Sequence, residues 1–337
     1  MTDSQSPSSP KIFIKSARRP WALDRLLTSI WENVDGIKAE DVVVMDDRTE
    51  SIYLEELKNR HPGIRIEDLS RASPKSKWFR KEPLYISGWR QTIQRDAGEF
   101  FMLIEDDCWV TSKLPLDQII ESMGSQRLDT VSLLDQHLEK YIPVQDPSPG
   151  SLQRVTTPAA TQSRSSVLRR FAYMAFLSRS PFGRALGLFL VTTKLLEGFE
   201  WTNAAVANTI SGSVFRTSWW LKLWGDFQHR VDDNVQNRIA HRVLLEHPQV
   251  ESPLALAGKM VVRTSYRTSV SASHKGINFE IANRVLSNHW LTGDIEVDET
   301  GDWSVSQIVN ILEADSESKP FANRYEDWCE EFYKIHN

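Results

Sequence analysis

The sequence FFMLIEDD, residues 100–107, joins five consecutive apolar residues to three carboxylates, Glu105, Asp106 and Asp107. An uninterrupted apolar run of this length predicts a strand buried on both faces, as in a parallel sheet. Open α/β sheets bind their ligands at the carboxyl ends of such strands. Three adjacent carboxylates repel one another there and lose hydration, so they require a cation or hydrogen-bond donors. A metal site with only oxygen ligands favours Mg²⁺ or Mn²⁺. The alternative to a metal site is that the three acids form a solvated turn after the strand.

The N-terminal part of the chain alternates short apolar runs with segments of helical spacing. In order these are a strand at 11–16, a helix that begins at Pro20, a strand at 41–47, a helix at 51–60, a strand at 63–68, a helix within 83–97 and the strand that begins at 100. This alternation predicts an α/β fold with a mostly parallel sheet flanked by helices. The second strand also ends in acids, Asp46 and Asp47, so both acid clusters are expected at one edge of the sheet.

Five segments carry recognisable motifs. They are IFIKSARRPWALDRLLTSI (12–30), VVVMDDRTES (42–51), AGEFFMLIEDDCWV (97–110), ISGSVFRTSWWLKL (210–223) and VDDNVQNRIAHR (231–242). Their order resembles the opening strand and helix, the D-D segment, the D-x-D metal strand, the pre-acceptor segment and the catalytic-base helix of family-2-like glycosyltransferases. The resemblance implies their Rossmann-like GT-A fold, here with a helical insertion and a C-terminal extension. The chain departs from the family at Lys15, Ala17, Arg18 and Glu105, where Pro, Tyr, Asn and Asp are usual, and at Arg90, where Asn is common.

The resemblance implies roles for the matching residues. Nucleotide-sugar binding is implied for Ser16, Asp46, Asp47, Arg90, Glu105 and Asp106. Asp107 is implied as the ligand of Mn²⁺ or Mg²⁺, with Glu105 and His289 as further ligands. Asp233 is implied as the general base, and the neighbouring Asp232 is the alternative.

Ordinary structural roles stay open for several of these residues. Asp46 suits a helix N-cap and Asp47 a solvated turn, because aspartate is favoured in both positions. Asp232 and Asp233 stand at the start of a predicted helix, where the helix dipole favours acids whatever their function. His289 is equally compatible with an ordinary hydrogen-bonded histidine.

The implied activity is transfer of a sugar from a nucleotide diphosphate, most commonly UDP, to a hydroxyl of a glycan, lipid-linked or peptide acceptor. A carboxylate-held metal would stabilise the leaving diphosphate, and a single base would give inversion. One alternative is a sugar-nucleotide nucleotidyltransferase, which needs a glycine-rich loop after the first strand, and SARRPW (16–21) has no glycine. The other is a non-catalytic carbohydrate-binding protein, against which the acids at both the metal and the base positions argue.

The motif positions divide the chain into five predicted parts. These are a disordered tail (1–10), a nucleotide-sugar-binding half (11–135), a basic helical or loop insertion (136–200), an acceptor-side half (201–257) and a C-terminal extension (258–337). Aromatic residues at helical spacing from Phe321 to Phe332 predict that the extension ends in a docked helix.

The insertion has an unusual charge pattern, because residues 151–196 contain seven basic residues and no acid. A basic amphipathic segment, here 164–194, could contact an anionic membrane surface and present a lipid-linked acceptor. A lid over the diphosphate, a grip on an acidic polymer and an ordinary helical subdomain with a solvated basic face are the alternatives.

Composition narrows the setting. A net charge of −5 offers no general attraction for nucleic acid. Cys108 and Cys329 form no metal or redox motif, and no uncharged apolar run reaches the roughly 18 residues of a membrane span. These features predict a cytoplasmic protein, with peripheral contact at the inner face of the membrane if the basic segment binds lipid.

Overall fold

The computed structural model describes residues 10–69, 86–133, 146–154, 182, 212–224, 254–265, 267–269 and 276–336. The strands are β1 (Lys11–Ser16), β2 (Val42–Asp46), β3 (Arg65–Asp68), β4 (Phe100–Glu105), β5 (Cys108–Val110), β6 (Thr130–Ser132), β7 (Leu152–Arg154), β8 (Ser213–Arg216), β9 (Leu254–Ala257) and β10 (Val262–Thr264). The helices are α1 (Pro20–Asn33), α2 (Ser51–Arg60), α3 (Ile86–Asp96), α4 (Leu116–Ser125), α8 (Thr217–Trp224), α10 (Phe279–Trp290), α11 (Val305–Ala314) and α12 (Ala322–His336).

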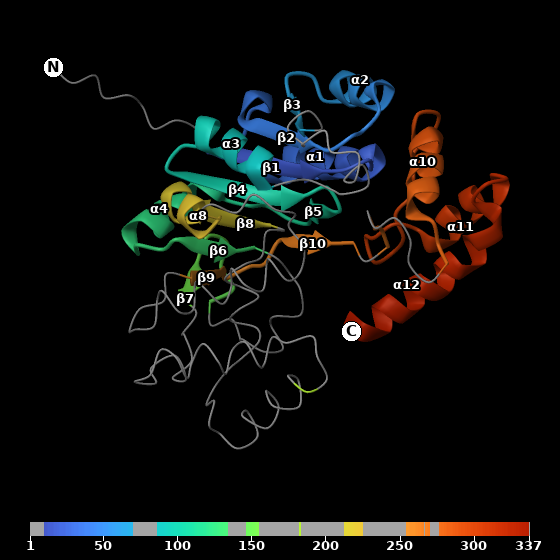
Figure 1. Ribbon diagram of the computed structural model, residues 1–337. Helices are drawn as coiled ribbons and strands as arrows, with labels where there is room; N and C mark the ends of the chain where they lie inside the picture. Colours follow the sequence, from blue (N-terminus) through green and yellow to red (C-terminus); the bar gives the residue numbers. More distant parts are fainter. Residues whose placement is uncertain are drawn as a thin grey trace.

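An eight-stranded sheet with the order β3-β2-β1-β4-β8-β6-β9-β7 organises the molecule (Figure 1). The first four strands in this order are parallel to one another, as the alternation of strands and helices predicts. β8 then runs antiparallel between β4 and β6, and β7 runs antiparallel to β9. The α/β class with a mostly parallel sheet is therefore confirmed, and the antiparallel strands come from the half of the chain that follows β4.

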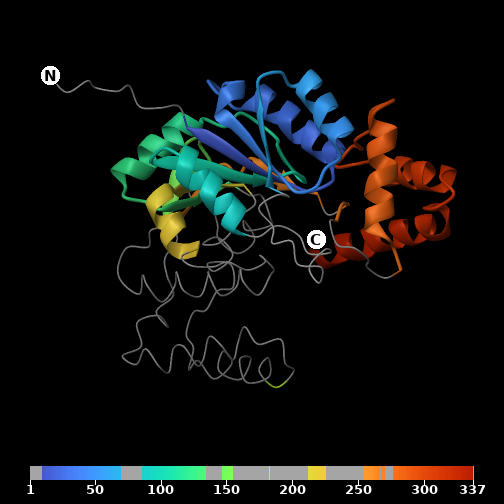
Figure 2. The ribbon, with the colours of Figure 1, turned by 45° about the horizontal axis from the view of Figure 1, so that its top comes forward.

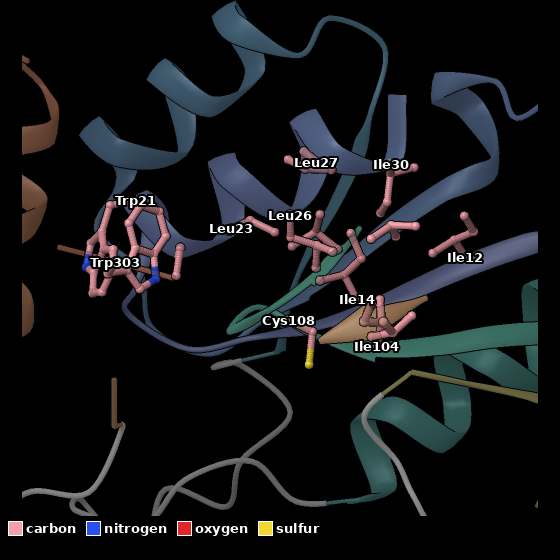
Figure 3. Close-up of a cluster of buried hydrophobic side chains, with 14 of the residues drawn as sticks. Ile12, Ile14, Trp21, Leu23, Leu26, Leu27, Ile30, Ile104, Cys108 and Trp303 are labelled. Atoms are coloured by element: carbon pink, nitrogen blue, oxygen red, sulfur yellow. The ribbon is translucent and has the colours of Figure 1, made fainter. Parts of the chain in front are cut away.

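Alternate residues of the central strands build two separate apolar layers. Ile12 and Ile14 of β1 pack on one face of the sheet against α1, whose buried residues include Leu23, Leu26 and Ile30 (Figure 3). This face follows from the period of two in a strand and the helical spacing of α1. Each such side chain contributes about 1.5–3 kcal/mol when it is fully removed from water.

The opposite face of the sheet is covered by α3 and α8, as the turned view shows (Figure 2). Phe13 of β1 and Phe101 of β4 point to this side, and their rings lie 5.5 Å apart in an edge-to-face arrangement. Trp89 of α3 and Trp220 of α8 belong to the same cluster. Helices on both faces bury almost all of β1, β2 and β4, which explains the apolar sequences of these strands, whereas β3 at the edge of the sheet is half-buried.

The C-terminal extension forms a helical layer of α10, α11 and α12 beside α1 (Figure 1). Phe279 of α10 lies 4.8 Å from the ring of Trp328 on α12, and Tyr325 lies 5.6 Å from the same ring. On the α1 side, the indole nitrogen of Trp290 donates to Asp24 at 2.9 Å. The predicted docking of the last helix is confirmed for its described side chains.

The parts predicted as an insertion and as the base-bearing helix lie largely outside the described residues. Only 146–154, 182 and 212–224 are described between 134 and 253. The basic segment 164–194 and its membrane, lid and structural alternatives therefore stay predictions, as do the five domain boundaries. Within the ranges that the structure describes, no helix has the length and apolar character needed to cross a membrane.

Candidate active site

Three adjacent strands carry polar side chains to one edge of the sheet. β1 lies between β2 and β4, and its register places Ser16 opposite Asp46. Beyond the strand ends, the amide of Asp47 donates to the carbonyl of Ser16 at 2.8 Å. On the other side, the amide of Asp106 donates to the carbonyl of Lys15 at 2.9 Å. The predicted convergence of the two acid clusters is confirmed.

Asp106 is almost fully buried at this edge, with 1% of its surface exposed. Its Oδ2 accepts from the hydroxyl of Ser16 at 3.1 Å and from the amide of Ala17 at 3.0 Å. Its Oδ1 accepts from the guanidinium of Arg19. Burial raises the pKa of Asp106, and the charge of Arg19 opposes that rise. Because its carboxylate is engaged by the protein itself, Asp106 holds the loop after β1 against the end of β4.

Arg19 supplies the counter-charge for the acid motif from inside the protein. Its Nη1 donates to Oδ2 of Asp107 at 3.0 Å and to the hydroxyl of Thr268 at 2.6 Å. Burial disfavours the charged guanidinium, but Asp106 and Asp107 outweigh burial and raise the pKa of Arg19 above its ordinary value. Arg19 therefore joins the first loop, the acid motif and a segment of the C-terminal extension.

Asp107 is the acid of the motif that suits a metal ion. Its side chain is 20% exposed, and only Oδ2 accepts from Arg19. Its Oδ1 lies 3.8 Å from the sulfur of Cys108, a weak donor, and within the described part of the chain no stronger donor to this oxygen is found. Mg²⁺ and Mn²⁺ sites commonly use one or two carboxylates together with water and substrate phosphates. The donor set at Asp107 fits such an ion.

Asp46 and Asp47 both support the turn between β2 and α2. Asp46 accepts from the amide of Thr49 at 3.0 Å and from its hydroxyl at 2.5 Å. Asp47 accepts from Nε of Arg48 at 3.0 Å and from its Nη2 at 3.2 Å. The alternative of a helix N-cap for Asp46 is wrong, because Glu50 occupies the N-cap of α2. The alternative of a solvated turn for Asp47 is also wrong, because Asp47 is 4% exposed.

The environment of Asp46 predicts a measurable pH dependence. Burial raises the pKa of Asp46 from its ordinary value of 3.8 to about 6, although Thr49 opposes the shift. The folded protein therefore binds the proton of Asp46 more tightly than the unfolded chain does. The stability that this proton binding contributes is fully present below the pKa of the unfolded chain and is lost as the pH rises through 6.

We expect the stability of the wild-type protein relative to Asp46→Asn to fall by about 2 kcal/mol between about pH 4.5 and about pH 7.5. Urea unfolding of both proteins across this range measures the difference. Titrations of groups that do not interact with Asp46 cancel, whereas Asp106, whose charge repels that of Asp46, contributes to the difference. A difference that does not change with pH would show that Asp46 has an ordinary carboxyl pKa.

A pocket of about 320 Å³ adjoins the acid edge on the side of α10. Arg18 from the loop after β1, Arg48 from the loop after β2 and Arg284 from α10 line it. Arg18 and Arg48 both have positive φ values, 54° and 64°, which non-glycine residues adopt at a cost and mainly at special sites. The strained loops and the pocket mark this edge as the candidate binding region.

Four other predicted residues contribute less to the described site. Arg90 is half-buried on α3, and His289 is half-buried near the end of α10. In the part of the chain that the structure describes, no three His, Cys, Asp or Glu side chains are grouped to hold a metal ion, so His289 belongs to no such group. Asp232 and Asp233 lie outside the described residues, and their roles stay predictions.

Sequence reasoning missed two basic residues that pair with the acids of this edge. Lys15 pairs with Glu105 and Arg19 pairs with both aspartates of the motif. The sequence does predict that three adjacent acids need compensation, but it assigns the compensation to a metal or to hydrogen-bond donors. The basic residues in KSARR (15–19), at the end of the first strand and in the loop after it, are the sequence signal that points to this pairing.

Comparisons with known proteins identify similar structures but no sequence family. No protein-family model and no curated protein matches the chain. S. aureus TarS 1–349 in complex with UDP-GlcNAc is similar at 12% identity and a TM-score of 0.39, over 96% of this chain and 89% of that chain. GalNAc-T7 with UDP, GalNAc and Mn²⁺ is similar at 13% identity and a TM-score of 0.44, over 97% and 57%.

A third similar structure is glucosyl-3-phosphoglycerate synthase from Mycobacterium tuberculosis in complex with Mn²⁺, UDP-glucose and phosphoglyceric acid. Its identity is 13% and its TM-score 0.27, over 40% of this chain and 48% of that chain. GT-A glycosyltransferases are thus among the solved structures that this chain is similar to. Identities and scores this low carry no conclusion about its activity.

Proposed function

We propose that the protein is a metal-dependent, inverting glycosyltransferase that moves a sugar from a nucleotide diphosphate to an acceptor hydroxyl. The observation that carries this proposal is the meeting of Ser16, Asp46 and the Glu105–Asp107 motif at adjacent strand ends. That edge is where open α/β sheets bind nucleotides. The order of the five sequence motifs assigns the same edge to the donor and a later helix to the base.

In this proposal each residue of the edge has a distinct task. Ser16 and Asp47 face the nucleoside, and the pocket beside Arg18 and Arg48 has the volume for a base or a ribose. Asp107 would hold a Mn²⁺ or Mg²⁺ ion, which when bound supplies Lewis-acid stabilisation of the leaving diphosphate. Asp106 and the segment it binds keep Asp107 in place.

Screening of nucleotide diphosphate sugars tests the proposal directly. The wild-type protein is incubated with UDP-, GDP-, ADP- and dTDP-sugars, with and without Mn²⁺, and hydrolysis and thermal stabilisation are measured. We expect one base to give metal-dependent stabilisation, with UDP as the first to test. Lack of stabilisation and of hydrolysis with all four bases would contradict the proposal, whichever acceptor the enzyme uses.

The base assignment gives a separate prediction. Asp233→Asn is expected to lower kcat by about a hundredfold, the lower end of the range for a general base, while donor affinity stays nearly unchanged. The reason is that the base acts on the acceptor only in the transition state. Asp232→Asn is the matched control, because it makes the same chemical change one position away. An inactive Asp232→Asn beside an active Asp233→Asn would move the role to Asp232, and a product with retained configuration would reject single displacement.

The acceptor is proposed only as a class: a glycan, a lipid-linked sugar or a peptide. The basic segment 164–194 would present a lipid-linked acceptor if it binds an anionic membrane. Cosedimentation with anionic but not neutral liposomes, weakened by salt, is the result expected for that arrangement.

A further inference from the structure

Lys15 is a buried lysine at the centre of the candidate site. It is the penultimate residue of β1, and the sheet register places it beside Glu105 of β4. Only 6% of its surface is exposed, a degree of burial that lysine rarely reaches without a charged partner. Its ammonium forms an ion pair with Oε1 of Glu105 and lies 4.3 Å from the centre of the Trp89 ring. Both contacts are electrostatically attractive for an ammonium group.

This ion pair changes the charge of the acid motif. Glu105, Asp106 and Asp107 carry three negative charges, and Lys15 and Arg19, which are bonded to them, carry two positive charges. The motif with its bonded cations therefore has a net charge of one negative unit. A divalent cation beside Glu105 would also approach the ammonium of Lys15, and like charges at such distances repel.

We propose that Lys15 withdraws Glu105 from the ligand set of the metal ion, so that Asp107 is the one carboxylate of the motif that contacts it. The remaining oxygen ligands then come from the donor diphosphate and from water, as is common for Mg²⁺ and Mn²⁺. This inference rests on the proposed function. It implies that the ion binds weakly to the free protein and strongly only together with the nucleotide, because one net negative charge holds a dication poorly.

The inference can be tested by Mn²⁺ titration, with the free ion measured by electron paramagnetic resonance. Wild type, Lys15→Met, Glu105→Gln and the double variant form a cycle, in which methionine keeps the unbranched apolar stem against Trp89 but removes the charge. Without nucleotide, we expect Lys15→Met to tighten Mn²⁺ binding about tenfold, within the range of coupling between contacting groups. The double variant is expected to lose this gain. Glu105→Gln alone, which leaves the charge of Lys15 unpaired, is expected to weaken Mn²⁺ binding, but by much less than Asp107→Asn.

Two results would overturn the inference. One is a Glu105→Gln variant that loses Mn²⁺ affinity as severely as Asp107→Asn, since Glu105 would then be a ligand in the native protein. The other is an unchanged Mn²⁺ affinity in a folded Lys15→Met variant. If Lys15→Met does not fold, the comparison of Glu105→Gln with Asp107→Asn on the native background decides alone.

The same titration separates this inference from the proposed function. In the presence of UDP, wild type is expected to bind Mn²⁺ at least about tenfold more tightly than without it, because the diphosphate adds ligands. If no nucleoside diphosphate binds at any Mn²⁺ concentration, the proposed function fails. The Mn²⁺-only cycle still tests the withdrawal of Glu105 by Lys15, because it needs no nucleotide.

Discussion

Asp107→Asn is expected to lower kcat by at least about a thousandfold, because metal stabilisation of a leaving diphosphate is worth several kcal/mol. The side chain of Asp107 is 20% exposed, and among the described residues the sulfur of Cys108, 3.8 Å away, is the donor nearest its Oδ1. Asparagine has one neutral side-chain oxygen; when that oxygen accepts from Arg19, an amide NH2 group replaces the oxygen that would face the ion. Metal-dependent nucleotide binding should therefore disappear as well. Steady-state kinetics and calorimetric titration of UDP with Mn²⁺ measure both effects.

A matched control separates the loss of the site from a general loss of charge. Asp117 is exposed in the first turn of α4, and with Pro10 and Phe100 it lines a different cavity, near the starts of β1 and β4. Asp117→Asn should therefore leave kcat and nucleotide affinity unchanged. Circular dichroism and the unfolding midpoint establish that both variants are folded. Full activity of Asp107→Asn, or of wild type after complete removal of metal by a chelator, would reject the metal assignment.

Arg19→Met is expected to lower the free energy of unfolding by about 3–5 kcal/mol, because it leaves a buried carboxylate without its partner. Arg19 is 4% exposed and binds Asp106, Asp107 and Thr268, so the side chain has no access to compensating water. Methionine fills part of the space without the charge. Urea unfolding at neutral pH measures the loss.

The pH dependence of the Arg19→Met effect identifies its cause. Burial already raises the pKa of Asp106, and removal of Arg19 should raise it further, so Asp106 takes up a proton in the variant. The deficit should therefore be smaller near pH 5 than near pH 8, and the double variant with Asp106→Asn should recover part of it. An exposed arginine provides the control: Arg95→Met, at a side chain 55% exposed, should cost less than about 1 kcal/mol. A deficit for Arg19→Met no larger than that of Arg95→Met would show that the buried pair contributes little.

The parallel half of the fold follows from local sequence patterns. The predicted strands at 11–16, 41–47 and 63–68 correspond to β1, β2 and β3, and the helix at 51–60 corresponds to α2. These elements are predictable because their apolar periodicity depends on neighbours within a few residues. Each strand also ends where its polar residues begin, so the acid edge could be placed before the structure was known.

Only the tertiary structure decided which basic residues pair with the acids at that edge of the sheet. Lys15 and Glu105 are 90 positions apart, and Arg19 and Thr268 are 249 positions apart. Their pairing depends on strand register and on the return of the C-terminal extension to the site, neither of which leaves a local periodicity. The antiparallel position of β8 between β4 and β6 has the same origin. The sequence by itself therefore determined which strands end in acids. The tertiary structure decided which of those acids pair with basic side chains of the same protein, because an ion pair depends on the distance between two charges in space and not on their separation in the sequence.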